Sequence, residues 1–184
     1  TPPTARPAPP VTNTPAAPAP AITPPAPAPP AARVDLPADG LLTQWRVGQG
    51  DSITLPDGTK GKLTARGEAS LNEAGHLVLA GGAWLLPPAV GEQLLAACRQ
   101  TQELTLELAF RADVGKQAGP ARLLSFSADP YNRNFTLGQA DQQLILRLRT
   151  PRSGNNGMPD QKLATAKPET WQHLQVSYRD GQLL

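Results

Sequence analysis

Four arginines in the last third of the chain are the residues whose type and spacing most directly suggest ligand chemistry. Arg147 and Arg149 alternate within one apolar–polar segment, and alternate residues of a β-strand project from the same face. A guanidinium group binds a carboxylate or a sulfate through two parallel hydrogen bonds, so this face would capture an acidic glycan. The alternative is an ordinary solvated face on which Glu107 supplies the opposite charge. Together with two asparagines of the following loop, the candidate ligand-binding residues are Arg133, Arg147, Arg149, Arg152, Asn155 and Asn156.

Groups that could perform catalysis are sparse by comparison. A retaining glycosidase needs two carboxylates about 5 to 5.5 Å apart. Glu103 and Glu107 are separated by two same-face steps, and Thr105 rather than an aspartate stands between them, so we interpret Glu107 as a solvated strand residue. His76 and His173 have no serine or cysteine partner in a recognisable arrangement. We therefore expect no catalytic residues and no enzyme activity.

The elements that position these residues are expected to be β-strands. Three segments alternate apolar and polar residues with a period of two, which is typical of strands with one buried and one wetted face. The apolar sets are Leu104, Leu106, Leu108 and Phe110; Leu144, Leu146 and Leu148; and Leu174, Val176 and Tyr178. Shorter strands are expected at 45–47, 52–55, 76–79, 83–86, 123–128 and 135–137, with a hairpin turn at Asp57-Gly58. The sequence thus predicts an all-β, antiparallel fold with one short helix over 92–99.

Composition divides the chain in two. Of the first 32 residues, 28 are Pro, Ala or Thr, so we expect 1–32 to be a disordered, extended linker, or alternatively a glycosylated stalk. Residues 33–184 have the size of one domain. Seventeen basic residues stand against fifteen acidic ones, and Arg6 is the only charged residue of the linker, so the domain is almost neutral. A neutral domain argues against nucleic-acid binding, and no apolar run is long enough to insert into a membrane.

The single cysteine and the three tryptophans carry little functional information. One cysteine allows no disulfide within the chain, and Cys98 falls on the apolar stripe of the expected helix, so we interpret it as a small core residue. Trp171 is expected to pack at a sheet edge. For Trp45 and Trp84 the sequence leaves stacking on a sugar and packing in the core open.

Both ends of the sequence suggest a longer parent protein. The chain begins with Thr1 rather than Met, and a Pro/Ala linker suits a tether to an upstream element such as a membrane anchor. Asp180-Gly181 predicts a hairpin whose return strand, 182–184, is very short. We therefore expect that strands on the C-terminal side are missing.

The order of the segments resembles that of laminin-G-like jelly rolls of the concanavalin A-like lectin/glucanase superfamily. The resemblance rests on 103–110, 123–127, 134–139, 144–150 and, most specifically, 171–181, which is similar to the signature W-x-H-[VL]-x-[VF]-[ST]-Y-x-x-G. It covers about 77–184. The resemblance implies a jelly-roll sandwich of two curved antiparallel sheets over 33–184.

The resemblance also implies a function. Such domains are mostly extracytoplasmic modules that bind glycans or proteins, so we expect a non-catalytic, lectin-like binding module that recognises a glycan or a surface protein through loops 129–134 and 150–162. The alternatives are a glycoside hydrolase of the same superfamily and a structural spacer of a membrane-anchored protein. Family members can bind calcium at one rim, and the candidates here are Asp129 and Asn132, with Asp141 and Asp160 as further loop acids. No other cofactor is expected.

Overall fold

The computed structural model describes residues 40–55 and 58–184. The chain divides into the units Thr1–Ala32 and Arg33–Leu184, and all the described residues belong to the second. The linker expected at 1–32 and the Asp57 half of the first hairpin turn lie outside the described residues. Gly58, the other half, has φ +80° and closes the turn through a hydrogen bond from its N–H to the carbonyl of Leu55, 2.9 Å.

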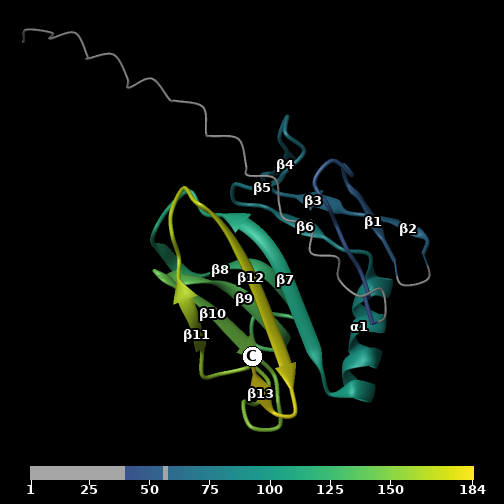
Figure 1. Ribbon diagram of the computed structural model, residues 1–184, viewed down its shortest axis with the longest axis vertical. Coiled ribbons are helices and arrows are strands. Elements are labelled where there is room, and N and C mark those ends of the chain that lie inside the picture. Colours follow the sequence, from purple (N-terminus) through teal and green to yellow (C-terminus); the bar gives the residue numbers. More distant parts are fainter. Residues whose placement is uncertain (1–39, 56–57) are drawn as a thin grey trace, which may run out of the picture. The chain divides into compact units, whose positions relative to one another are not determined.

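The described part is built of antiparallel strands and one helix (Figure 1). The all-β expectation is therefore confirmed. Before the helix lie six three-residue strands: β1 Ser52–Thr54, β2 Lys60–Lys62, β3 Thr64–Arg66, β4 Ala69–Leu71, β5 Leu77–Leu79 and β6 Ala83–Leu85. After the helix α1, Pro88–Thr101, come β7 Leu104–Arg111, β8 Gln117–Ser127, β9 Arg133–Asp141, β10 Gln143–Leu148, β11 Gln161–Thr165, β12 Trp171–Arg179 and β13 Gln182–Leu183.

Two larger sheets carry the core. One has the order β11-β10-β9-β8 and the other the order β13-β12-β7. Their inner faces share one buried cluster, to which β7 contributes Leu106, β12 contributes Val176 and the four-stranded sheet contributes Phe135, Leu137 and Leu146. Because burial of these side chains from both sheets removes a large apolar area from water, the two layers stabilise one another in the manner of a sandwich.

The strongest alternating segments form strands where they were expected. β7 pairs with β12 along its whole length, with Leu108 opposite Leu174 and Leu106 opposite Val176. The Asp180-Gly181 hairpin is also confirmed: both residues have positive φ, 52° and 76°, as a tight two-residue turn requires.

Three local expectations were wrong. Residues 45–47 are not a strand, because only Gln44 forms a bridge, to Thr54, and the Trp45 indole donates to the carbonyl of Gly50, 2.9 Å. The helix is longer than 92–99, since Pro88 occupies its first turn, where a missing N–H costs nothing. The loops 129–134 and 150–162 are both shorter than expected, because β9 begins at Arg133 and β11 begins at Gln161.

The helix joins the main core to a second cluster. Val90 packs with Ile53 and Leu63, while Leu94, one turn further along, contacts the main cluster. Trp45 and Trp84 pack against this second cluster, which favours the core interpretation for both indoles. Cys98 is half-buried, and burial raises the pKa of its thiol.

Part of the outer face of the four-stranded sheet is buried, although the apolar–polar alternation predicts that this face is exposed to solvent. Thr136 is fully buried, and Ile145, which the pattern assigns to the wetted face, is 2 % exposed. β8 joins this sheet irregularly: its pairing with β9 shifts register at three places, and Pro120 lies within it.

Candidate ligand-binding site

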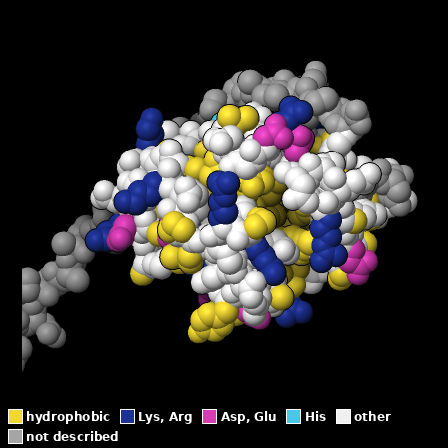
Figure 2. Space-filling model, turned by 90° about the horizontal axis from the view of Figure 1, so that it is seen from below, with side chains coloured by type: hydrophobic (Ala, Val, Ile, Leu, Met, Phe, Trp, Pro, Cys, Tyr) yellow, Lys and Arg dark blue, Asp and Glu magenta, His cyan; other side chains and the backbone are white. Residues whose placement is uncertain are grey.

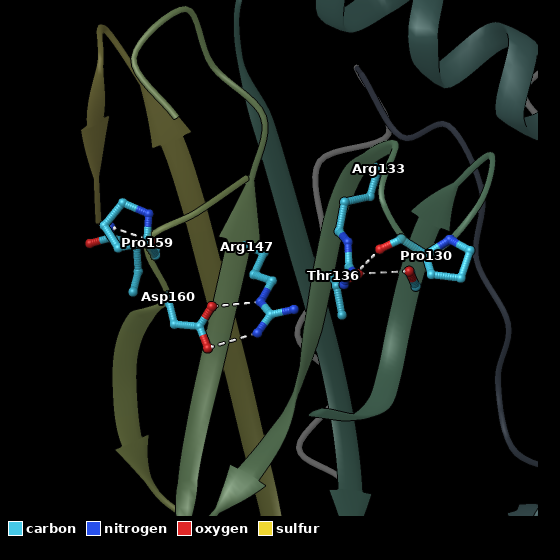
Figure 3. Close-up of polar contacts among 8 residues, drawn as sticks. Pro130, Arg133, Thr136, Arg147, Pro159 and Asp160 are labelled. Carbon is cyan, nitrogen blue, oxygen red and sulfur yellow. Dashed lines mark hydrogen bonds and ion pairs between the residues drawn. The ribbon is translucent and has the colours of Figure 1, made fainter. Parts of the chain in front are cut away.

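A fork-shaped ion pair lies on the outer face of the four-stranded sheet. Arg147 of β10 donates from Nε to Oδ1 of Asp160 at 2.5 Å and from Nη2 to Oδ2 at 3.1 Å (Figure 3). The two side chains are 15 % and 26 % exposed, so little solvent screens the pair. The counter-charge of Arg147 is thus Asp160. The alternative that assigned this role to Glu107 is wrong, because Glu107 lies on β7 in the other sheet.

Arg133, the first residue of β9, is the most unusual side chain in this region. It is only 6 % exposed, whereas an exposed position was expected for a surface patch. Its Nη2 donates to the backbone carbonyl of Pro130, and in Figure 3 the side chain runs along β9 toward Thr136. Its Nε and Nη1 are buried and have no hydrogen-bond partner among the described residues. A buried guanidinium with two unused donors is costly, because such groups are almost always paired in folded proteins.

The local charge around Arg133 is positive. Burial, followed by the positive charges of Arg147 and Arg122, lowers the pKa of Arg133, while Asp160 and Asp129 act in the opposite direction. The group nevertheless stays protonated at neutral pH, as arginine does in proteins generally. Three arginines therefore share this region with two carboxylates, one of which is already committed to Arg147.

Two hydroxyl groups, those of Ser125 and Thr136, form the surface of the sheet beside the arginines and are called the floor of the site. Cross-strand pairing sets Ser125 opposite Thr136, and Thr136 opposite Arg147, so all three project from the same face. The hydroxyls of Ser125 and Thr136 are 2.9 Å apart and hydrogen-bonded (Figure 3). The floor is consequently polar but uncharged.

The segment 150–157 brings both candidate asparagines to the site. The carbonyl of Asn155 accepts a hydrogen bond from the backbone N–H of Arg133, 3.0 Å. The side-chain oxygen of Asn156 is buried without a partner among the described residues. Gly157 has φ +67° and lies so close to β10 that a Cβ there would stand 2.8 Å from the backbone nitrogen of Leu148. This approach, which only glycine permits, seats the segment on the sheet.

Two of the six candidate residues stay apart from this group. Arg149 and Arg152 are exposed, and within the described chain their side chains form no hydrogen bond or ion pair. Lysine and arginine side chains are spaced singly on the face drawn in Figure 2, around hydrophobic ones, rather than gathered in a stripe. The structure therefore replaces a four-arginine surface patch by a mostly buried pair, Arg133 and Arg147.

The turn at 129–132 borders the site and holds the two calcium candidates. Asp129 Oδ2 accepts from the side-chain amide of Asn132, 2.8 Å, and Oδ1 accepts from the backbone N–H groups of Tyr131 and Asn132, both 2.7 Å. The bond from the Asn132 side chain, followed by the two backbone bonds, lowers the pKa of Asp129. Over residues 40–55 and 58–184 no three His, Cys, Asp or Glu side chains cluster in a way that could hold a metal ion. Calcium binding remains a prediction, which calorimetry with millimolar calcium tests.

Sequence reasoning missed the pairing on the other sheet. The Nε2 of His173 and the Oε1 of Glu107 are 2.7 Å apart across β12 and β7. Glu107 is 17 % exposed, so its interpretation as a solvated residue was wrong, and its second oxygen is buried without a partner in the described part. The sequence placed both residues on the polar faces of their alternating segments, which is the only hint that they could interact. Their contact depends on the register between β7 and β12, which the sequence does not show.

Two hollows, of about 310 and 370 Å³, lie between β11 and β12, away from the arginines. The residues that line them include Leu144, Leu163, Leu174 and Val176, which also pack in or against the inter-sheet core. The hollows are therefore the incompletely filled seam between the two layers.

Comparison of the chain with protein-family models, curated proteins and solved structures finds no match. No helix of the described part combines the length and the apolar character needed to cross a membrane.

Proposed function

We propose that this protein is a non-catalytic, extracytoplasmic module of the laminin-G-like, jelly-roll sandwich type, and that it binds a glycan where the turn 129–132 and the segment 150–157 meet at the start of β9. The observation that carries the proposal is the buried Arg133 with its two unused donors, Nε and Nη1. Polar groups that converge without partners are typical of ligand sites, because a bound ligand completes the hydrogen bonds that the protein leaves open.

A glycan is favoured over other ligands by the groups around Arg133. Guanidinium, amide and hydroxyl groups offer several directional hydrogen bonds, which suit a polyhydroxylated molecule. Tyr131, in the neighbouring turn, is 76 % exposed, and its ring offers a flat apolar surface to the C–H face of a sugar.

Binding rather than catalysis is proposed because both carboxylates in the described part of the site are already engaged, and Asp129 accepts three hydrogen bonds within its own turn. Arginine stays protonated at neutral pH, and Asp160 is engaged in a two-point ion pair with Arg147. A catalytic carboxylate would have to leave that pair before it could act.

A glycan array probed with the labelled chain of residues 1–184 tests the proposal. We expect a defined set of glycans to bind, with binding lost in Arg133→Ala and weakened in Tyr131→Ala. Arg149→Ala, which removes an exposed arginine of the same region, is the matched control and should bind like the parent. An array without binding, or binding that survives both site substitutions, would refute the proposal, and retention of a purified surface protein alone would favour a protein ligand instead.

A further inference from the structure

We infer that the site takes an oxyanion, the carboxylate or sulfate group of an acidic sugar, held between Arg133 and Arg147. This inference rests on the proposed glycan-binding function and names the class of glycan.

Arg133 has two unused donors that suit an oxyanion. Its Nη2 bonds to the carbonyl of Pro130, and the remaining donors Nε and Nη1 lie on different edges of the planar group, so each offers one charge-assisted hydrogen bond to an oxygen of a carboxylate or sulfate. A neutral hydroxyl could satisfy one of these donors but would leave the buried charge unbalanced.

The surroundings of Arg133 carry an excess of positive charge. Arg147 and Arg122 act on Arg133 as like charges, and Asp160, the first of its two candidate counter-ions, already bonds to Arg147 through both oxygens. In Figure 3 the third nitrogen of Arg147 points away from Asp160 toward β9. An added negative group between the two arginines would balance the excess positive charge.

The unused donors are buried, so an anion reaches them only after a local movement of the chain. Arg133 is bonded to both neighbouring segments, through Nη2 to the carbonyl of Pro130 and through its backbone N–H to the carbonyl of Asn155, 3.0 Å. Ser153 fastens the base of the second segment by donating to the carbonyl of Leu148, 2.6 Å. We expect the part around 155–156, beyond that fastening, to be the part that moves.

The competing explanation is internal. The unpaired oxygen of Asn156 is a potential acceptor near Arg133, and a side-chain rotation would let the two satisfy each other without any ligand. The experiment has to separate this closed arrangement from an anion site.

Three small probes, glucuronate, glucose 6-sulfate and glucose, are titrated into the chain of residues 1–184 at constant ionic strength. We expect glucuronate, glucose 6-sulfate or both to bind at least tenfold more tightly than glucose, and the more effective anion identifies carboxylate or sulfate as the recognised group. Arg133→Met should lose this preference tenfold or more, whereas Arg149→Met should keep it within twofold. Equal affinities for all three probes, or an unchanged preference in Arg133→Met, would overturn the inference.

Because Arg133→Met could fail to fold, a measurement on the unaltered chain accompanies it. The Nε–H resonance of Arg133 in an NMR spectrum should shift on saturation with the preferred anion, while that of Arg149 stays in place. An unmoved Arg133 signal in the presence of bound probe means that the donors are satisfied internally and overturns the inference. If neutral glycans bind the array in an Arg133-dependent way while neither anion is preferred, the proposed function stands and this inference alone fails.

Discussion

Replacement of Ile145 by alanine tests whether the outer face of the four-stranded sheet is truly covered. Ile145 is 2 % exposed although its neighbours Leu144 and Leu146 face the inter-sheet core on the opposite side. Truncation of a buried isoleucine to alanine costs about 2–5 kcal/mol, from lost transfer free energy and the cavity left behind. At this degree of burial we expect about 3 kcal/mol. For a domain of this size that corresponds to a melting temperature roughly 6–12 °C lower.

The measurement is urea unfolding followed by circular dichroism, with two companion variants. Leu146→Ala, on the inner face and 1 % exposed, should lose a similar amount, while Leu79→Ala, 47 % exposed, should lose less than about 1 kcal/mol. The reasoning is refuted if Ile145→Ala unfolds within about 0.5 kcal/mol of the parent while Leu146→Ala shows its full loss. That outcome would mean that the outer face is exposed to solvent, as the apolar–polar alternation of the sequence predicts.

Three further predictions concern the same region. Asp160→Ala should lower the free energy of unfolding by about 2 kcal/mol, because it leaves the mostly buried Arg147 without its ion-pair partner. The control is Asp113→Ala, which removes an 89 % exposed carboxylate 3.8 Å from Arg111 and should cost less than about 0.5 kcal/mol in the same urea assay. Gly138→Ala should cost about 1–3 kcal/mol, since the new Cβ would stand 2.5 Å from the backbone oxygen of Ala121, and a melting temperature equal to that of the parent would contradict this close approach. The carboxyl of Asp129 should titrate below its ordinary pKa of 3.8 when followed by NMR. Because the pKa is lower in the folded state than in the unfolded state, the ionised carboxylate stabilises the turn fully above about pH 3.8, and this stabilisation is lost as the pH falls through the folded-state pKa. Asp129→Asn should remove that acid dependence, and a pKa at or above 3.8 would contradict the turn geometry.

The strands that alternate most strictly could be predicted from the sequence residue by residue. β7 begins and ends at the expected residues because its period of two specifies one buried face, and a slip by one position would expose Leu106 and Phe110. The same period of two does not show whether other segments of the chain cover the opposite face of the sheet. For this reason Ile145 was predicted to lie on a solvent-exposed face. The start of α1 was misplaced because a proline pair ends a strand and begins a helix equally well.

The candidate site was predictable in its residue types but not in its pairing. Arg133, Arg147, Asn155 and Asn156 do come together, since a β-hairpin and the loop that follows it return to one place. The partner of Arg147 depends on the register between β10 and β11, which shifts between Leu144 and Ile145, and no local pattern encodes such a shift. The burial of Arg133 likewise depends on tertiary contacts, such as the hydrogen bond from its backbone to Asn155, that no local sequence pattern encodes.

The irregular pairing of β8 with β9 has a consequence for how copies of this protein behave toward one another. β8 forms one border of the four-stranded sheet, so its outward N–H and C=O groups are potential templates for a strand from another molecule. The register shifts interrupt the regular spacing that such a strand would have to match, and Pro120 has no N–H to offer it. This border thus discourages edge-to-edge aggregation, which would help keep the molecules apart at high concentration.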